Sequence, residues 1–192
     1  MRLNNFLSGF LIVLILSSCK EEQIVKPAAQ LRLEYPAHAY KPLPADRDCP
    51  FGFMINEHSE AEWKQNCAVN IRYPKMKAAF YLTYNKVNNN LDSLLRDAQK
   101  LAYDHTIKAS SIPEQPFVNP DDDVYGMFYM INGDAATQAG FYVTDSINHF
   151  INGALYFDAK PNFDSIYPAV MYLREDMRRI IETVRWKGAL ED

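Results

Sequence analysis

Short strand-like runs and two helical stripes follow one another in an order that leaves this 192-residue chain few possible folds. In the strand-like runs, apolar and polar residues alternate with a period of two, which is typical of strands buried on one face. Four such runs precede the first helical stripe, and three lie between the two stripes. The predicted strands cover residues 31–35, 51–55, 69–73, 78–84, 124–131, 137–144 and 150–157.

Some of the segments between and within these strands carry signals of their own. Asn132-Gly133-Asp134 separates two strands, and because an Asn-Gly step suits positive φ angles, we predict a hairpin turn there. Gly153 lies inside the last strand, where a glycine is typical of a bulge or of a close packing contact. Residues 110–123 contain three prolines and are expected to form a surface loop without regular structure.

Apolar residues at steps of three and four predict two amphipathic helices. The first covers about residues 90–108, with Asn90 as the predicted N-cap. The second follows Ser165 as N-cap, holds Pro168 in its first turn and ends at Gly188.

Strands joined by hairpins, rather than alternating with helices, favour an α+β fold. We expect a mainly antiparallel sheet of about six to seven strands with two helices packed on it, both on one face. The order of strands and helices is similar to that of PsbP/Mog1-like architectures, an analogy that does not settle function. The folded part is predicted to be a single domain over residues 31–188.

The N-terminus has the features of a bacterial lipoprotein. Residues 6–16 form an apolar run that is too short to span a bilayer comfortably and is typical of a secretory signal peptide. The run ends in Leu16-Ser17-Ser18-Cys19, which matches the lipobox. We therefore expect residues 1–18 to be the signal peptide, Cys19 to carry lipid with fatty acids such as palmitate, and residues 19–30 to be a tether. An uncleaved anchor or plain secretion is the alternative.

Two further cysteines, Cys49 and Cys67, form an even pair in an exported chain, which favours a disulfide. Such a bridge would stabilise the fold by roughly 3 kcal/mol in the chain-entropy model, because it closes a loop in the unfolded chain. Two free buried thiols are the simplest alternative. A metal or redox site is a further one, although no C-x-x-C spacing supports it.

No motif with catalytic or metal-binding chemistry is recognisable. The four histidines, His38, His58, His105 and His149, lack metal-ligand spacing, and the common nucleophile, P-loop and dinucleotide patterns are absent. The run Asp121-Asp122-Asp123 offers carboxylates that suit Ca²⁺, but it lacks EF-hand spacing, so a solvated acidic loop is the alternative. We predict no catalytic residue, no metal and no cofactor.

The composition bears on partners. The chain has 20 Lys and Arg against 24 Asp and Glu, a formal net charge of -4, so it lacks the basic surface that nucleic acid requires. Its 12 Tyr and 11 Phe could line a ligand groove, although such residues on strands more often pack in the core.

Several short motifs, taken in their order along a lipoprotein of this length, carry a resemblance to a known family. They are Leu31 to Pro36, Cys49-Pro50-Phe51, Asn70 to Pro74, Tyr103 to Ala109, Val124 to Met127, Asn152 to Phe157, Asp164-Ser165 and Arg174-Glu175-Asp176. On these residues the chain resembles the gliding-motility lipoprotein GldD family of the Bacteroidota.

The resemblance implies a non-enzymatic component required for gliding and for the linked type IX secretion system, with other envelope proteins of these machines as partners. It brings no catalytic residues, and only Cys19 is carried over, as the lipidation site. We expect an outer-membrane lipoprotein facing the periplasm, with the cell surface as the alternative because Lys20-Glu21-Glu22 resembles a surface-export signal. A ligand-binding envelope lipoprotein is the alternative function, and a hydrolase built around His105 and His149 is a third.

Overall fold

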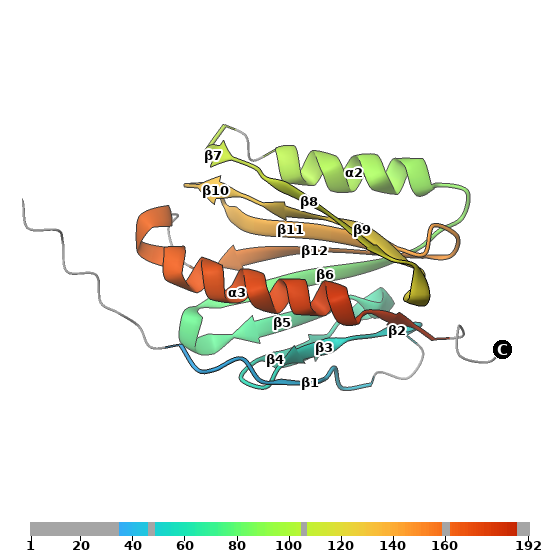
Figure 1. Ribbon diagram of the computed structural model, residues 1–192, viewed down its shortest axis with the longest axis horizontal. Coiled ribbons are helices and arrows are strands. Elements are labelled where there is room, and N and C mark those ends of the chain that lie inside the picture. The colour runs from blue at the N-terminus through green and yellow to red at the C-terminus, as the bar shows by residue number, and fades with distance from the viewer. Residues whose placement is uncertain (1–34, 46–48, 105–106, 159–161, 188–192) are drawn as a thin grey trace, which may run out of the picture. The chain divides into compact units, whose positions relative to one another are not determined.

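The computed structural model describes residues 35–45, 49–104, 107–158 and 162–187 (Figure 1). The predicted signal peptide, the tether, Cys19 and the first four residues of the strand expected at 31–35 lie outside the described residues. So do His105 and Gly188. The predicted domain boundaries therefore stay predictions.

Among the described residues, seven strands form one open antiparallel sheet, in the order β4-β5-β6-β12-β11-β9-β8. This confirms the α+β prediction of a mainly antiparallel sheet of six to seven strands with two helices. The strands, in sheet order, are β4 Glu60–Trp63, β5 Val69–Tyr73, β6 Ala78–Lys86, β12 His149–Phe157, β11 Thr137–Thr144, β9 Val124–Met130 and β8 Glu114–Asn119.

The alternation that predicted the strands follows the two faces of this sheet. In β6, Phe80 and Leu82 are buried in the main core, whereas Tyr81 and Thr83 point to the other face and are exposed. Gly153 in β12 pairs in regular register, so it forms no bulge. A Cβ atom there would lie 2.5 Å from Cε1 of Phe141, so the close-packing interpretation is the correct one.

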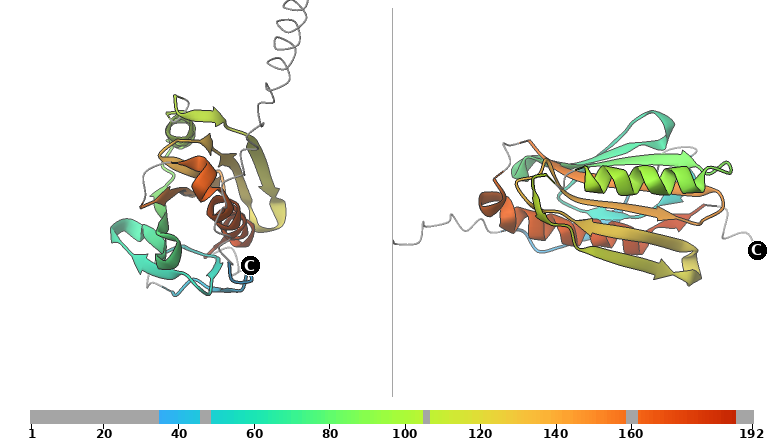
Figure 2. Two further views of the ribbon diagram at one scale, coloured as in Figure 1. Left: turned by 90° about the vertical axis from the view of Figure 1, so that its left-hand side faces the viewer. Right: turned by 90° about the horizontal axis from the view of Figure 1, so that it is seen from above.

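The two helices lie on opposite faces of the sheet, so the expectation that both share one face is wrong. Helix α3, Phe163–Thr183, packs its Leu173 and Met177 against the core face. Helix α2, Leu91–Tyr103, lies over β11 on the other face and buries Ala98 and Ala102. The left view of Figure 2 shows the sheet curving around α3, with α2 on the outside.

Both helices differ from their predicted ends. The side chain of Asn162, not Ser165, caps α3 by accepting a hydrogen bond from the Ser165 amide. As a result Pro168 lies in the second turn of α3 rather than the first. At α2, the side chain of Asn90 makes no cap and instead accepts from the Asn88 amide. The last residue of α2 is Tyr103, short of the expected 108.

The segment 110–123, expected as a loop, contains two strands and a 3-10 turn. Strand β7, Ala109–Ser111, pairs with β10, Asn132–Gly133, and β8 pairs with β9 as an edge strand of the sheet. The turn is η3, Pro120–Asp122. Pro116 is tolerated in β8 because an edge strand can leave one N–H side unpaired. Asn132 and Gly133 pair with β7, so the tight hairpin turn predicted there does not form. The strands on either side, β9 and β11, do pair antiparallel.

Short strands near the two ends of the described chain pack on α3. They are β1 Tyr40–Pro42, β2 Phe51–Gly52, β3 Met54–Asn56 and β13 Arg185–Trp186. The chain also forms two further 3-10 turns, η1 Gln65–Cys67 and η2 Pro74–Met76. β1 pairs with β3, and β13 pairs with β2. A disulfide joins Cys49 to Cys67, with their Cα atoms 5.5 Å apart.

Candidate interaction surface

A buried carboxylate lies where α3 meets the N-terminal segment. Asp176 is 1% exposed and accepts hydrogen bonds from Nδ2 of Asn56 at 2.9 Å and 3.1 Å, while Nδ1 of His38 lies 2.8 Å from its Oδ1. The His38 ring stacks on Tyr172, with centroids 4.2 Å apart. A buried carboxylate is stable only when such partners surround it. Asp176 therefore fastens the segment before β1 to α3.

Most groups around this Asp–His pair bond to one another, whereas the buried Tyr73 hydroxyl, whose pKa is raised by burial and by the charge of Asp176, has no hydrogen-bond partner among the described residues. Asn56 also donates to the hydroxyl of Tyr172 at 2.9 Å, and the Tyr40 hydroxyl lies 3.2 Å from Nδ1 of His38. Burial, followed by the charge of Asp176, raises the pKa of Tyr40 above its ordinary range. The one hydroxyl nucleophile bonded to this cluster, Ser59, is 3% exposed and donates to the Asn56 carbonyl. The geometry suits structural support better than acid–base catalysis.

A second buried charge, Arg174, lies two residues before Asp176 on α3. Its guanidinium is bonded to the carbonyls of Ile131 and Gln138 and to Oδ1 of Asn132. Burial lowers the pKa of Arg174 to about 10. The residue therefore supports the chain between β9 and β11. The sequence pattern did not predict that Arg174 and Asp176 are buried. The one feature that could have drawn attention to them is that both belong to Arg174-Glu175-Asp176, one of the motifs that carry the family resemblance.

The histidines are not brought together with a nucleophile in the part of the chain that the structure describes. His149 lies 2.9 Å from the Tyr84 hydroxyl through Nδ1 and stacks on Trp186 with centroids 5.1 Å apart. Burial lowers the pKa of His149. His58 is exposed. Because His105 lies outside the described residues, the hydrolase hypothesis gains no support here.

In the acidic run, Asp121 and Asp123 are exposed, whereas Asp122 is held by other side chains. Asp122 pairs with Nε of Arg185 at 2.8 Å and accepts from Nδ2 of Asn119 at 2.6 Å. The carbonyl of Asp123 accepts from the Trp186 indole at 3.1 Å. Among the described residues, no group of three or more His, Cys, Asp or Glu side chains is placed to hold a metal ion.

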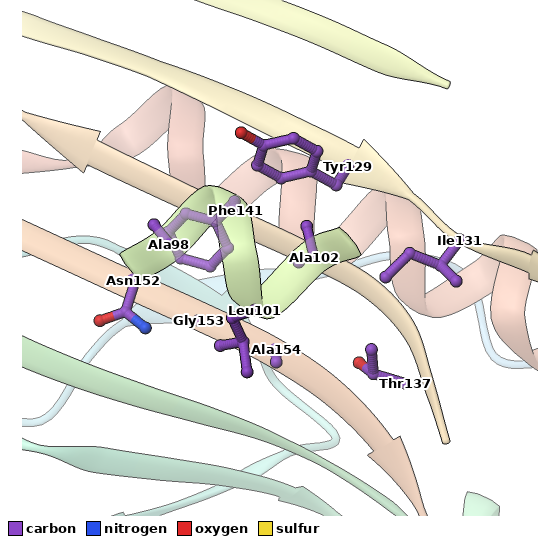
Figure 3. A pocket seen from close by; sticks show the side chains of 11 residues that line it. Ala98, Leu101, Ala102, Tyr129, Ile131, Thr137, Phe141, Asn152, Gly153 and Ala154 are labelled. Atoms are coloured by element: carbon purple, nitrogen blue, oxygen red, sulfur yellow. The ribbon is translucent and has the colours of Figure 1, made fainter. Parts of the chain in front are cut away.

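The two best-formed pockets among the described residues are too small for a ligand groove. The pocket beneath α2, drawn in Figure 3, lies between Ala98 and Leu101 on one side and Gly153 and Ala154 on the other, and its volume is about 10 Å³. The other, between β8 and α3, has a volume of about 40 Å³. Small-molecule sites usually need roughly 300–1,000 Å³, so neither pocket supports the ligand-binding alternative.

The sheet has an uncovered area beside α2, which we call the open sheet face and define by the outward side chains of β4, β5 and β6 together with Tyr156 of β12. Tyr81, 38% exposed, makes an edge contact with Tyr156, with centroids 5.7 Å apart. Next to them, Nε of Arg72 pairs with Glu62 at 3.3 Å. Tyr and Arg are the residues enriched at protein interfaces, so this face is the best candidate for an interaction surface.

A comparison with protein families identifies the family of the chain. The family described as gliding motility lipoprotein GldD matches residues 20–186, which is more than half of the chain. The chain belongs to the GldD family. As a member of the GldD family it is a lipoprotein of the cell envelope with a role in gliding motility. No curated protein matches the chain. Among the described residues, no helix is long and apolar enough to cross a membrane.

Proposed function

We propose that the protein is a non-enzymatic, lipid-anchored scaffold that stabilises partner proteins of the gliding machinery and of the linked type IX secretion system. Lipid on Cys19 holds it in the outer membrane, with the folded domain facing the periplasm. The partners bind the open sheet face. The protein itself uses no cofactor and no metal ion.

The observation that carries this proposal is the contrast between the two faces of the sheet. The core face is covered by α3 and by the N-terminal strands, whereas on the other face α2 covers β11 and the adjoining part of β12 and leaves β4, β5 and β6 uncovered. The uncovered part displays Tyr81, Tyr156 and Arg72 on rigid, paired strands. A preformed face of this kind binds a partner without an ordering cost.

The absence of catalytic function is supported by how the described titratable groups are used. Asp176 and Arg174 are buried and fully engaged in holding elements together, and His149 packs on Trp186. The two best-formed pockets are too small for a substrate. A scaffold function is consistent with all three observations.

A gene deletion, complemented with the wild type and with Cys19→Ala, tests the anchored component. Colony spreading and secretion of type IX cargo are scored, and protein levels are compared. We expect the deletion to abolish spreading or secretion and Cys19→Ala to fail to restore it at normal protein levels. If both activities survive the deletion, the proposed function is wrong for this organism.

The role of the open sheet face is tested by combining Tyr81→Ser with Tyr156→Ser. The matched control combines Val118→Ser with Ile147→Ser, which removes two exposed apolar side chains, 68% and 72% exposed, from other parts of the surface. We expect only the tyrosine variant to lose complementation and chemical crosslinks to motility proteins while it stays folded. Equal behaviour of the two variants would remove the open sheet face from the proposal.

A further inference from the structure

Beyond the scaffold role, we propose that the first half of α3 and the neighbouring Ile107 rest on the lipid bilayer to which the chain is anchored. We call Ile107, Phe163, Tyr167 and Met171 the membrane-facing patch. The inference rests on the proposed lipidation of Cys19, since the lipid brings the domain to the membrane. The patch then fixes which end of the domain touches the bilayer.

The patch consists of three exposed large side chains and the half-buried Phe163. Ile107 is 89% exposed, Met171 is 47% exposed and Tyr167 is 46% exposed. Phe163 contacts Tyr167 with ring centroids 5.4 Å apart. Because Phe163, Tyr167 and Met171 are spaced four residues apart, their side chains form one stripe along α3.

Contacts of Gly133 and Asp134 show that Ile107 lies at the same end of the domain as this stripe. The carbonyl of Lys108 lies against Gly133, since a Cβ atom at Gly133 would be 2.7 Å from it. The next residue, Asp134, accepts a hydrogen bond from the amide of Phe163 at 2.8 Å. Ile107 and the start of α3 therefore lie at the same end of the sheet (Figure 1).

The outward side of α3 changes character along its length. From Phe163 to Met171 it is mainly aromatic and apolar, and from residue 175 onward it carries Glu175, Arg178, Arg179 and Glu182 in two ion pairs. The outer side of a helix on a water-soluble domain is normally polar throughout. The apolar half is about 12 Å long at 1.5 Å per residue, so this length of α3 can lie along the interface with its apolar side toward the acyl chains, as amphipathic segments do.

The described chain begins beside α3. Tyr35, the first described residue, stacks on Tyr172 with centroids 5.3 Å apart, and Tyr172 follows Met171 directly. Figure 1 shows the first described residues and the start of α3 at the same end of the sheet. The sixteen residue steps from Cys19 to Tyr35 would have a root-mean-square span of about 20–24 Å as a flexible chain. The lipid on Cys19 therefore keeps the patch within reach of the bilayer at high effective concentration.

Charges at this end favour an apolar rather than an electrostatic contact. Lys108 is exposed there, but so are Asp134 and Asp164. Mixed charge gives little attraction to anionic lipids, whereas Tyr is typical of membrane interfaces because its ring is apolar and its hydroxyl is polar. The contact should therefore form on neutral phosphatidylcholine and persist at high salt.

The test places an environment-sensitive fluorophore on a single introduced cysteine in the full, lipidated protein. The variants are Tyr167→Cys and Met171→Cys, with Ile147→Cys as the control. Ile147 is 72% exposed and lies in the β11–β12 turn, beyond the far end of β11. An eight-residue strand is about 26 Å long, so the control probe is remote from the patch. Cys49 and Cys67 are bonded to each other and do not react.

The labelled proteins are reconstituted on phosphatidylcholine vesicles, with and without brominated acyl chains, and vesicle attachment is measured separately by flotation. We expect probes at residues 167 and 171 to shift to shorter wavelength and to lose most of their emission to the brominated lipid, at low and high salt. The probe at residue 147 should behave as it does in water.

The outcomes separate this inference from the proposed function. If the protein floats but the probes at 167 and 171 stay water-like, or if all three probes respond alike, the membrane-facing patch is refuted and the anchor stands. If the protein does not float, the anchoring proposal fails and this inference fails with it. If the patch probes are shielded in native envelope membranes but not on pure lipid vesicles, a protein partner covers the patch and the bilayer contact is refuted.

Discussion

Replacing Asp176 with alanine should destabilise the fold by about 4 kcal/mol. The carboxylate is 1% exposed and has Asn56 and His38 as partners, at 2.9 Å and 2.8 Å. The change removes hydrogen bonds to a buried charged group, which contribute about 1.5–3 kcal/mol each. About 1–3 kcal/mol of the loss comes from one N–H of the buried Asn56 amide, which is left without an acceptor while the other still donates to the Tyr172 hydroxyl. His38 loses less, because its partly exposed ring can turn to water.

The assay is thermal and urea unfolding of the chain that carries Cys19→Ser, so that the protein stays in solution. At roughly 2–4 °C per kcal/mol for a chain of this size, Asp176→Ala should lower Tm by about 8–16 °C. The matched control is Glu175→Ala, the neighbouring carboxylate, which is 54% exposed and pairs with Arg178. Its loss should stay within about 0.5 kcal/mol. A cost below about 1 kcal/mol for Asp176→Ala, or equal costs for both variants, would refute the reasoning.

Three further predictions concern stability. Replacing both Cys49 and Cys67 with serine should cost about 3 kcal/mol in urea unfolding, and a reductant should then have no further effect, in contrast to the wild type. Because burial lowers the pKa of His149 from its ordinary value of 6.5, its neutral form is favoured in the folded state. Stability from this group should be complete above about pH 6.5 and fall as the pH drops toward the lowered value, and His149→Gln should reduce that slope in acid unfolding. Gly153→Ala should cost about 1–3 kcal/mol by overpacking, whereas Gly52→Ala, with open space around it, should be nearly neutral in thermal unfolding.

The sheet could be predicted because its strands are buried on one face more than on the other. Alternation along residues 78–84 and 150–157 reports this difference directly, and β6 and β12 lie where it indicates. The strand β8 was missed because prolines at 113, 116 and 120 normally interrupt strands. At a sheet edge one side of the strand has no neighbouring strand, so the missing N–H of Pro116 costs no hydrogen bond between strands. The prolines therefore predict a loop where the edge position allows a strand.

The placement of the helices could not be predicted for a different reason. An apolar stripe such as Leu173 and Met177 shows which side of a helix is buried, but it does not show which face of the sheet receives it. The buried charges Arg174 and Asp176 were equally hidden, because charged residues on a helix are normally solvated. Only their long-range partners, Gln138 and Asn56, make their burial possible.

The attachment of the N-terminal segment determines how the domain would carry mechanical load. Tension transmitted from a lipid anchor enters at Tyr35 and meets the stacking on Tyr172 and the His38–Asp176 contact before it reaches β1. Both contacts are made with α3, so the pull is passed to the longest helix rather than to an edge of the seven-stranded sheet. A load between the proposed lipid anchor and a moving partner on the open sheet face therefore passes through α3 and its packing against the sheet, rather than pulling directly on an edge strand.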